Sequence, residues 1–201
     1  MKLEFFFDCS SPWTYLAFHN VQPMAQELGL EIDWQPILVG GIFNTVNQSV
    51  YEQRAKPNKA KARYHKRDMM EWAEVAGLNI KFPPAIFPIN SVKAMRACIA
   101  LKPQGLLVPF ATHIFEAYWS EDQDISSDAV MRDCLETVGA DTDAIMAAIQ
   151  TPEIKDQLKT NTQTVIDRGG FGSPTMYLGD RMYFGNDRLP LIRARIEQNT
   201  K

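Results

Sequence analysis

Hydrophobic and polar positions divide the chain into sections, and the first section is typical of strand, helix, strand. Lys2 to Phe7 is a short apolar run of the kind that forms a buried strand. Apolar residues recur at helical spacing from Trp13 to Leu28, and Leu30 to Leu38 alternates apolar with polar side chains. Ser11-Pro12 is expected to open the helix, because serine caps free N–H groups and proline suits the first helical position. Pro23 is expected to kink or split that helix.

The middle section is predicted to be mostly helical. A loop containing Gly40-Gly41 and residues Asn44 to Gln48 leads into a basic stretch from Arg54 to Arg67, and a helix ends at Gly77. Three prolines between residues 83 and 88 then break the chain. Apolar positions at the 3.6-residue period predict further helices near Val92–Leu101, Leu106–Trp119, Asp128–Val138, Thr142–Ile149 and Glu153–Arg168.

The last section returns to strands. Pro174 to Leu178 and Arg181 to Phe184, joined by Gly179-Asp180, predict a hairpin, and a final helix follows. Strands at both ends with helices between them predict an α/β protein with a thioredoxin-like fold and an inserted all-helical domain. We expect a discontinuous thioredoxin-like domain over residues 1–40 and 170–201, with the helical insertion domain at 41–169.

Composition narrows the class of protein. The chain has 201 residues, which suits one compact domain or one domain with a large insertion. Its 21 basic and 24 acidic residues give a net charge of −3, which argues against a nucleic-acid-binding or membrane-surface protein. No stretch approaches the roughly 18 apolar residues of a membrane span, and the N-terminus lacks the features of a signal peptide.

Cysteine and histidine positions predict neither disulfides nor a metal site. Cys9, Cys98 and Cys134 are far apart and form no C-x-x-C pair and no zinc quartet. The three histidines are equally scattered. Free thiols fit a reducing compartment, so we expect a cytoplasmic protein without a metal.

Ser11 is the first candidate for chemistry. A thioredoxin-like fold places its redox C-x-x-C where the first strand meets the first helix, and here Ser11-Pro12-Trp13-Thr14 occupies that position. A hydroxyl cannot form a disulfide, but it can donate a hydrogen bond to the thiolate of a ligand. The positive end of the helix lowers the pKa of a thiol held there. The alternative is an ordinary helix cap.

Further candidates lie in three later segments. Ser173-Pro174 precedes a strand and is expected to be a cis pair whose backbone can bond a peptide ligand; the alternative is a proline that simply begins the strand. Asn186 and Asp187 stand at a helix start, which suits an anionic group or a ligand ammonium, or merely caps the helix. Asn47 and Lys61 belong to the loop and basic stretch, which could receive an anionic ligand end or could form a solvated helix face.

Together these segments resemble the kappa-class glutathione transferases and the related bacterial 2-hydroxychromene-2-carboxylate isomerases, from Lys2 to about Ile196. The most specific matches are Phe7–Tyr15, Gly172–Met176 and Phe184–Leu189. The resemblance implies glutathione binding and, usually, a homodimer.

By that resemblance each candidate residue has a role toward glutathione. Ser11 stabilises the glutathione sulfur as a thiolate, and the Ser173 backbone, beside Pro174, pairs with the cysteinyl unit. Asn186 and Asp187 hold the γ-glutamyl end, and Asn47 and Lys61 lie near the tripeptide.

The expected function is therefore a glutathione-dependent isomerase, or a kappa-type transferase, acting on a small electrophile or aromatic carboxylate. The isomerases carry a lysine shortly after the second strand, and Phe43 occupies that place here. The rivals are a thioredoxin-like protein without redox activity and a non-enzymatic binding module. Trp13, Phe43, Phe87 and Trp119 are candidates to line the electrophile pocket. Cys9 is either a small apolar residue at a strand end or a redox-sensitive thiol.

Overall fold

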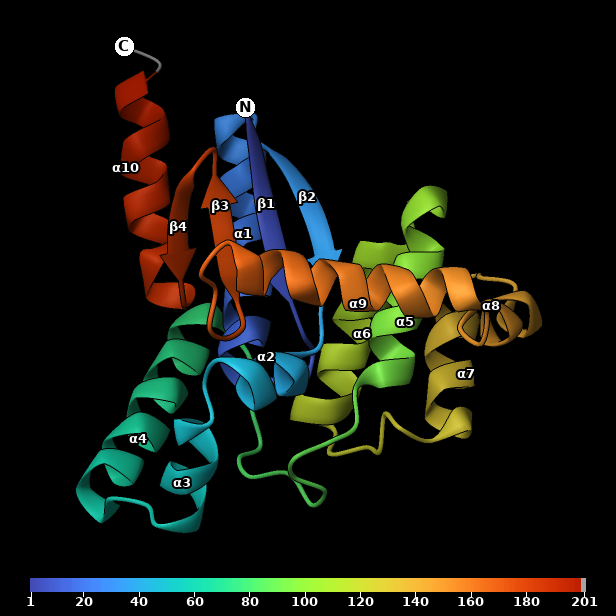
Figure 1. Cartoon of the computed structure of the whole chain (residues 1–201), viewed down its shortest axis with the longest axis horizontal. Coiled ribbons are helices and arrows are strands. Elements are labelled where there is room, and N and C mark those ends of the chain that lie inside the picture. The colour runs from blue at the N-terminus through green and yellow to red at the C-terminus, as the bar shows by residue number, and fades with distance from the viewer. Residues whose placement is uncertain (200–201) are drawn as a thin grey trace.

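A four-stranded sheet lies at the centre of the computed structural model, which describes residues 1–199 (Figure 1). Its strands stand in the order β2-β1-β3-β4. The first two run parallel, whereas β3 is antiparallel to both β1 and β4. This is the sheet of the predicted α/β, thioredoxin-like fold. The strand bounds are Lys2–Phe7 for β1, Glu31–Pro36 for β2, Thr175–Leu178 for β3 and Arg181–Phe184 for β4.

The helix that follows β1 runs unbroken. Helix α1 spans Pro12–Leu28, begins at the Ser11 cap and ends at Gly29, whose φ of 60° suits glycine. The expectation that Pro23 would split this helix was wrong. Val21 and Met24, on either side of the proline, are buried in the core. Their burial offsets the roughly 3 kcal/mol that an interior proline costs a helix.

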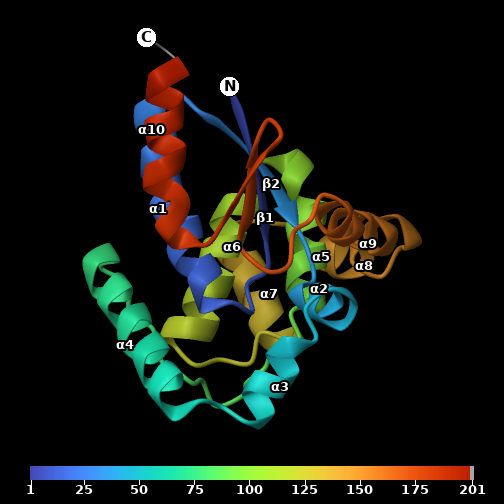
Figure 2. The ribbon, with the colours of Figure 1, turned by 60° about the vertical axis from the view of Figure 1, so that its left-hand side comes forward.

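Helices cover both faces of the sheet. Helices α1 and α10 (Leu189–Asn199) lie on one side of the sheet, and α9 (Pro152–Asp167) lies on the other (Figure 2). The alternation of β1 explains this arrangement. Phe5 and Phe7 face the large core shared with α1, whereas Phe6 packs in a smaller core with Val165 of α9.

The middle of the chain is helical as predicted, with bounds that differ from the prediction by a few residues. After residue 91, α5 begins where the sequence predicted, and the long helix predicted to end at Trp119 finishes as a π-helical turn, Glu116–Ser120. The remaining helices are α2 (Val39–Thr45), α3 (Ser49–Ala55), α4 (Lys59–Ala76), α5 (Val92–Leu101), α6 (Leu107–Phe115), α7 (Asp128–Thr137) and α8 (Thr142–Ala148), with short 3-10 turns at Lys102–Gln104 and Asn186–Arg188.

The segment around Gly40-Gly41 is a helix, α2, and not the predicted loop. Its start is fixed by distant partners: Leu38 N donates to Thr162 Oγ1 at 3.0 Å, and Val39 N donates to Asp8 Oδ2 at 2.8 Å. A Cβ on Gly41 would lie 3.3 Å from the Thr162 methyl group, so glycine allows α2 to approach α9 closely. These tertiary contacts override the weak helix propensity of glycine.

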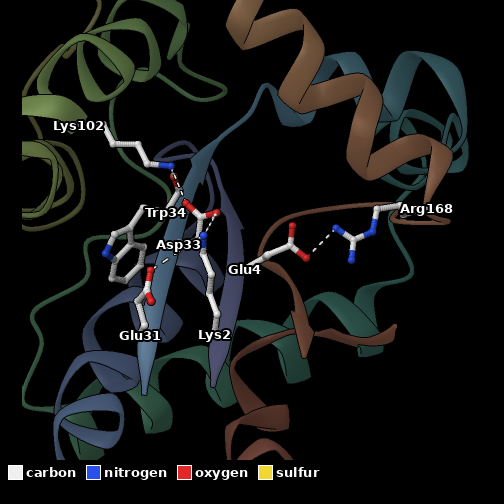
Figure 3. A network of polar contacts seen from close by, with 7 residues as sticks. All are labelled: Lys2, Glu4, Glu31, Asp33, Trp34, Lys102 and Arg168. Atoms are coloured by element: carbon white, nitrogen blue, oxygen red, sulfur yellow. Dashed lines mark hydrogen bonds and ion pairs between the residues drawn. The ribbon is translucent and has the colours of Figure 1, made fainter. Parts of the chain in front are cut away.

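A polar network fastens the two parallel strands on the same face of the sheet as α9 (Figure 3). Asp33 of β2 accepts from Lys2 at 3.0 Å and from Lys102 at 2.6 Å. Next to it, Glu4 of β1 pairs with Arg168, just after α9, at 2.8 Å. These residues occupy the same face as Phe6 because side chains alternate along a strand. The network therefore joins the end of α9 and the 3-10 turn after α5 to the sheet.

One large hydrophobic core runs from the sheet into the helices that follow it. Phe7 of β1 lies 6.5 Å from Phe115 of α6 between ring centroids. The division into a thioredoxin-like domain and an insertion domain at 41–169 stays a prediction. Within residues 1–199, none of the helices combines the length and apolarity needed to cross a membrane.

Candidate active site

A cavity of about 670 Å³ opens at the carboxyl end of β1. Its lining comes from the start of α1, the loop before β3, helices α2 and α3, and the irregular segment between residues 82 and 91. Clefts of this size at the end of a strand are common ligand sites. Of the candidate residues, Ser11, Asn47 and Ser173 line this cavity.

Ser11 stands at the first turn of α1 and at the cavity wall. Its Oγ accepts from Thr14 N at 3.3 Å and donates to the carbonyl oxygen of Ser173 at 3.2 Å. The hydroxyl is therefore both a helix cap and a donor that faces the loop before β3. The free N–H groups of the first turn add positive potential at the same place.

The Ser173-Pro174 peptide bond is cis, as the sequence predicted. The Ser173 hydroxyl accepts a hydrogen bond from Asp8 N at 3.0 Å and forms a second hydrogen bond with Thr14 Oγ1 at 2.8 Å. The carbonyl oxygen of Ser173 accepts a hydrogen bond from the Ser11 hydroxyl. The loop before β3 is therefore fixed both to the end of β1 and to the start of α1. Thr14 occupies the place of the second redox cysteine and serves here as a buried structural partner.

The sequence reasoning missed Asp8 as a site residue. Asp8 is buried, and its two carboxylate oxygens accept from Ser10 N at 2.9 Å and Val39 N at 2.8 Å. Burial raises the pKa of this carboxyl above its ordinary value, and the hydrogen bonds oppose that rise. An acid directly after a buried strand was the available signal, but its partner Val39 is distant in sequence.

Cys9 points into the core and not into the cavity. Its side chain is fully buried, and burial raises the pKa of its thiol well above the ordinary value. Its carbonyl accepts from Trp119 Nε1 at 2.9 Å. Of the two interpretations of Cys9, the geometry favours the apolar residue at a strand end.

The rim of the cavity is formed by Phe171 and Phe184, whose ring centroids lie 4.5 Å apart. Gly172 passes so close to the Phe184 ring that a Cβ would lie 2.8 Å from it, so a larger residue would require that ring to shift. Asn47 Nδ2 donates to the Phe171 carbonyl at 3.0 Å. Asn47 thus ties the segment between α2 and α3 to the loop before β3.

Asn186, Asp187 and Lys61 are not among the residues that line the cavity. Asn186 is buried just after β4; its Oδ1 accepts from Asn20 at 3.0 Å, while its Nδ2 has no partner within residues 1–199. Asp187 pairs with Arg188 at 3.1 Å. Lys61 lies in the exposed first turn of α4.

Aromatic side chains form part of the cavity wall. Trp13, Phe43 and Phe87 line the cavity, as the sequence suggested, together with Phe82. Trp119 does not line it; this side chain is fully buried behind Phe82, with ring centroids 6.3 Å apart. Serine hydroxyls beside an apolar wall suit a ligand that combines a polar peptide with an aromatic or unsaturated group.

Known proteins are similar to this chain over nearly its whole length. A 2-hydroxychromene-2-carboxylate isomerase of Pseudomonas putida is 29% identical over 197 residues, covering 96% of this chain and 93% of its own. Human glutathione S-transferase kappa 1 is 25% identical over 206 residues, covering 94% and 88%. A solved 2-hydroxychromene-2-carboxylate isomerase superposes with a TM-score of 0.84 at 26% identity, covering 100% of this chain and 96% of that one.

A family model described as the DsbA-like thioredoxin domain matches residues 2–197, which include both serines and every strand of the sheet. The chain therefore belongs to the DsbA-like thioredoxin domain family.

Proposed function

We propose that this protein is a glutathione-dependent enzyme, an isomerase like 2-hydroxychromene-2-carboxylate isomerase or else a kappa-type transferase. The observation that carries the proposal is the Ser11 hydroxyl, placed at the start of α1 and facing the cis Ser173-Pro174 pair inside the cavity. Serine and threonine stand where a redox enzyme of this fold needs two cysteines. The similarity to isomerases and kappa transferases supports the same function.

The role of Ser11 is to stabilise a thiolate. Bound glutathione would supply a sulfur nucleophile, and a free thiol with a pKa near 8.5 is mostly protonated at neutral pH. Lowering that pKa by about 2 units requires that the site stabilise the thiolate over the thiol by about 2.7 kcal/mol. A hydrogen bond to a charged group contributes roughly 1.5–3 kcal/mol and a helix N-terminus about 0.3–1 kcal/mol. Ser11 and the first turn of α1 together supply the required amount.

Other residues fit the tripeptide. The Ser173 backbone beside Pro174 is proposed to pair with the cysteinyl unit, and Asn47 and Lys61 to lie near the ligand. Asn186 and Asp187 are proposed to hold the γ-glutamyl end. The buried Nδ2 of Asn186 supports this assignment, because it is a donor without a partner in the described chain and such groups are rare.

Titration of glutathione into the protein tests the proposal. The ultraviolet absorbance of the thiolate is followed against pH for the wild type, Ser11→Ala and the neighbouring Ser10→Ala. We expect bound glutathione to ionise about 2 pH units below free glutathione in the wild type and in Ser10→Ala, and Ser11→Ala to remove most of this shift, leaving only the contribution of the helix terminus. Binding without any shift in the wild type, or an unchanged shift in Ser11→Ala, would contradict the proposed role of Ser11.

A further inference from the structure

Arg54 is the one lysine, arginine or histidine among the described residues that line the cavity. It belongs to α3, and its guanidinium carbon lies 5.7 Å from the ring centroid of Phe43 and 5.5 Å from that of Phe87. Both rings line the cavity as well. Three segments far apart in the sequence thus place a positive charge on the aromatic wall.

The guanidinium of Arg54 is held by the rings but its charge is not neutralised. Within residues 1–199 it forms no ion pair with an acidic side chain, whereas Arg67, in the same basic stretch, pairs with Glu71 at 2.8 Å. The acid of the cavity, Asp8, already accepts two backbone N–H groups. Contact with a ring face within about 6 Å orients a guanidinium and leaves the N–H donors in its own plane available.

We propose that Arg54 binds the acidic group of the second substrate, so that the site selects aromatic electrophiles that carry a carboxylate. This inference rests on the proposed function and assigns to it the residue that recognises the acidic group of the substrate. A planar guanidinium matches a carboxylate with two parallel hydrogen bonds. Phe43 and Phe87, which position the guanidinium, also offer ring surface to an aromatic body.

Glutathione also carries carboxylates, so the source of the anion has to be decided. Arg54 lies among aromatic rings, whereas Ser11, Ser173 and Asn186, the residues proposed for the tripeptide, come from α1 and from the segments before β3 and after β4. An aromatic environment favours the second substrate over a flexible polar peptide, because rings stack on rings.

Two electrophiles that differ by one carboxylate test the inference with glutathione present. They are 1-chloro-2,4-dinitrobenzene, which is neutral, and 4-chloro-3,5-dinitrobenzoate. Arg54→Met is expected to lower kcat/KM for the benzoate by about 10- to 100-fold, mainly through KM, and to change that for the neutral compound by less than about twofold. Arg54→Lys is expected to lie between, since it keeps the charge without the planar fork. Arg67→Met is the control and is expected to leave both values unchanged.

Two results would overturn the inference. If Arg54→Met lowers kcat/KM equally for both electrophiles and raises the KM for glutathione, Arg54 binds the tripeptide and not the second substrate. An unchanged benzoate value in Arg54→Met removes Arg54 from recognition altogether.

If the wild type turns over neither electrophile, the transferase form of the proposed function is at fault, and direct binding decides the role of Arg54. Calorimetric titration then compares 2-naphthoate with 2-naphthamide. A wild-type preference for the carboxylate that Arg54→Met loses supports the inference, and a wild type without preference overturns it.

Discussion

At the scale of single residues, the site depends on groups that face away from the ligand as much as on Ser11. The Ser173 hydroxyl forms hydrogen bonds with Asp8 N and with Thr14 Oγ1. The Asp8 carboxylate accepts hydrogen bonds from the backbone N–H groups of Ser10 and Val39. The bonds from Asp8 N and Val39 N are buried, so each satisfies a backbone donor that water cannot reach. Asp8 thereby fixes α2 against the end of β1, at the wall of the cavity.

The buried Asp8 carboxyl makes stability depend on pH in a defined direction. Its pKa in the folded protein is raised above 3.8 by burial. Below the unfolded-state pKa the group is protonated in both states and burial carries no ionic penalty; the penalty grows as pH rises through the folded-state pKa. The free energy of unfolding of the wild type, minus that of Asp8→Asn, is therefore expected to be larger near about pH 4 than at about pH 7.

Urea denaturation at a series of pH values measures this difference, with the exposed Asp180→Asn as the control. A difference that stays flat, or that rises with pH, would show that the Asp8 pKa is not raised in the folded protein.

The sequence could predict the serines of the site but not all of their neighbours. Ser11 and Ser173-Pro174 stand at positions that the order of strands and helices defines, so a local motif is sufficient to find them. Asp8 and Arg54 acquire their roles through contacts with Val39 and with the rings of Phe43 and Phe87. Such contacts join residues from different elements and become visible only in the folded chain.

At the scale of elements, helices with their own hydrophobic stripe were predicted well, and helices that depend on neighbours were not. The prediction for Val92–Leu101 agrees with α5 at both ends. Helix α2 was missed because its first N–H groups are satisfied by Asp8 and Thr162 and its glycines suggest a turn. Pro23 gave the opposite error, since buried neighbours maintain α1 through a residue that usually breaks helices.

Pro23 is therefore expected to be a destabilising residue in α1. Pro23→Ala restores a backbone N–H inside the helix and removes the clash of the proline ring. We expect the free energy of unfolding to rise by about 1–3 kcal/mol, after about 0.4–1 kcal/mol is lost through the more flexible unfolded chain. Urea denaturation checks this against Gln26→Ala, an exposed change in the same helix. A Pro23→Ala variant less stable than the wild type would contradict the expectation.

At the scale of the whole molecule, the large core connects regions that the sequence presents as separate. The order of elements along the chain was predicted in outline because motifs at both ends of the chain mark the strands. The cavity was predicted only in part, since its walls come from the sheet end, from α2 and α3, and from residues 82–91 together. Its aromatic wall is supported from behind by Trp119, which packs on Phe82.

A shared core predicts that the chain unfolds as one cooperative unit. Leu3 in β1 and Leu135 in α7 are both fully buried in that core. Leu3→Ala and Leu135→Ala are each expected to cost about 2–5 kcal/mol and to shift one common transition. Far-ultraviolet circular dichroism and tryptophan fluorescence in urea should therefore give coincident midpoints for both variants. An early helical transition confined to Leu135→Ala would indicate that residues 41–169 unfold on their own.

The bond from Ser11 to the Ser173 carbonyl has a consequence for the kind of thiol that the site accepts. A hydroxyl has one proton, and in this structure that proton is given to a carbonyl of a nearly buried residue. A sulfur anion that takes the proton leaves the carbonyl without a donor, which is unfavourable unless the incoming molecule brings an N–H of its own. The exchange is balanced only for a thiol carried on an amide backbone. The proposed thiolate site is therefore expected to favour a peptide thiol over a bare alkyl thiol, because only the peptide supplies the replacement N–H donor.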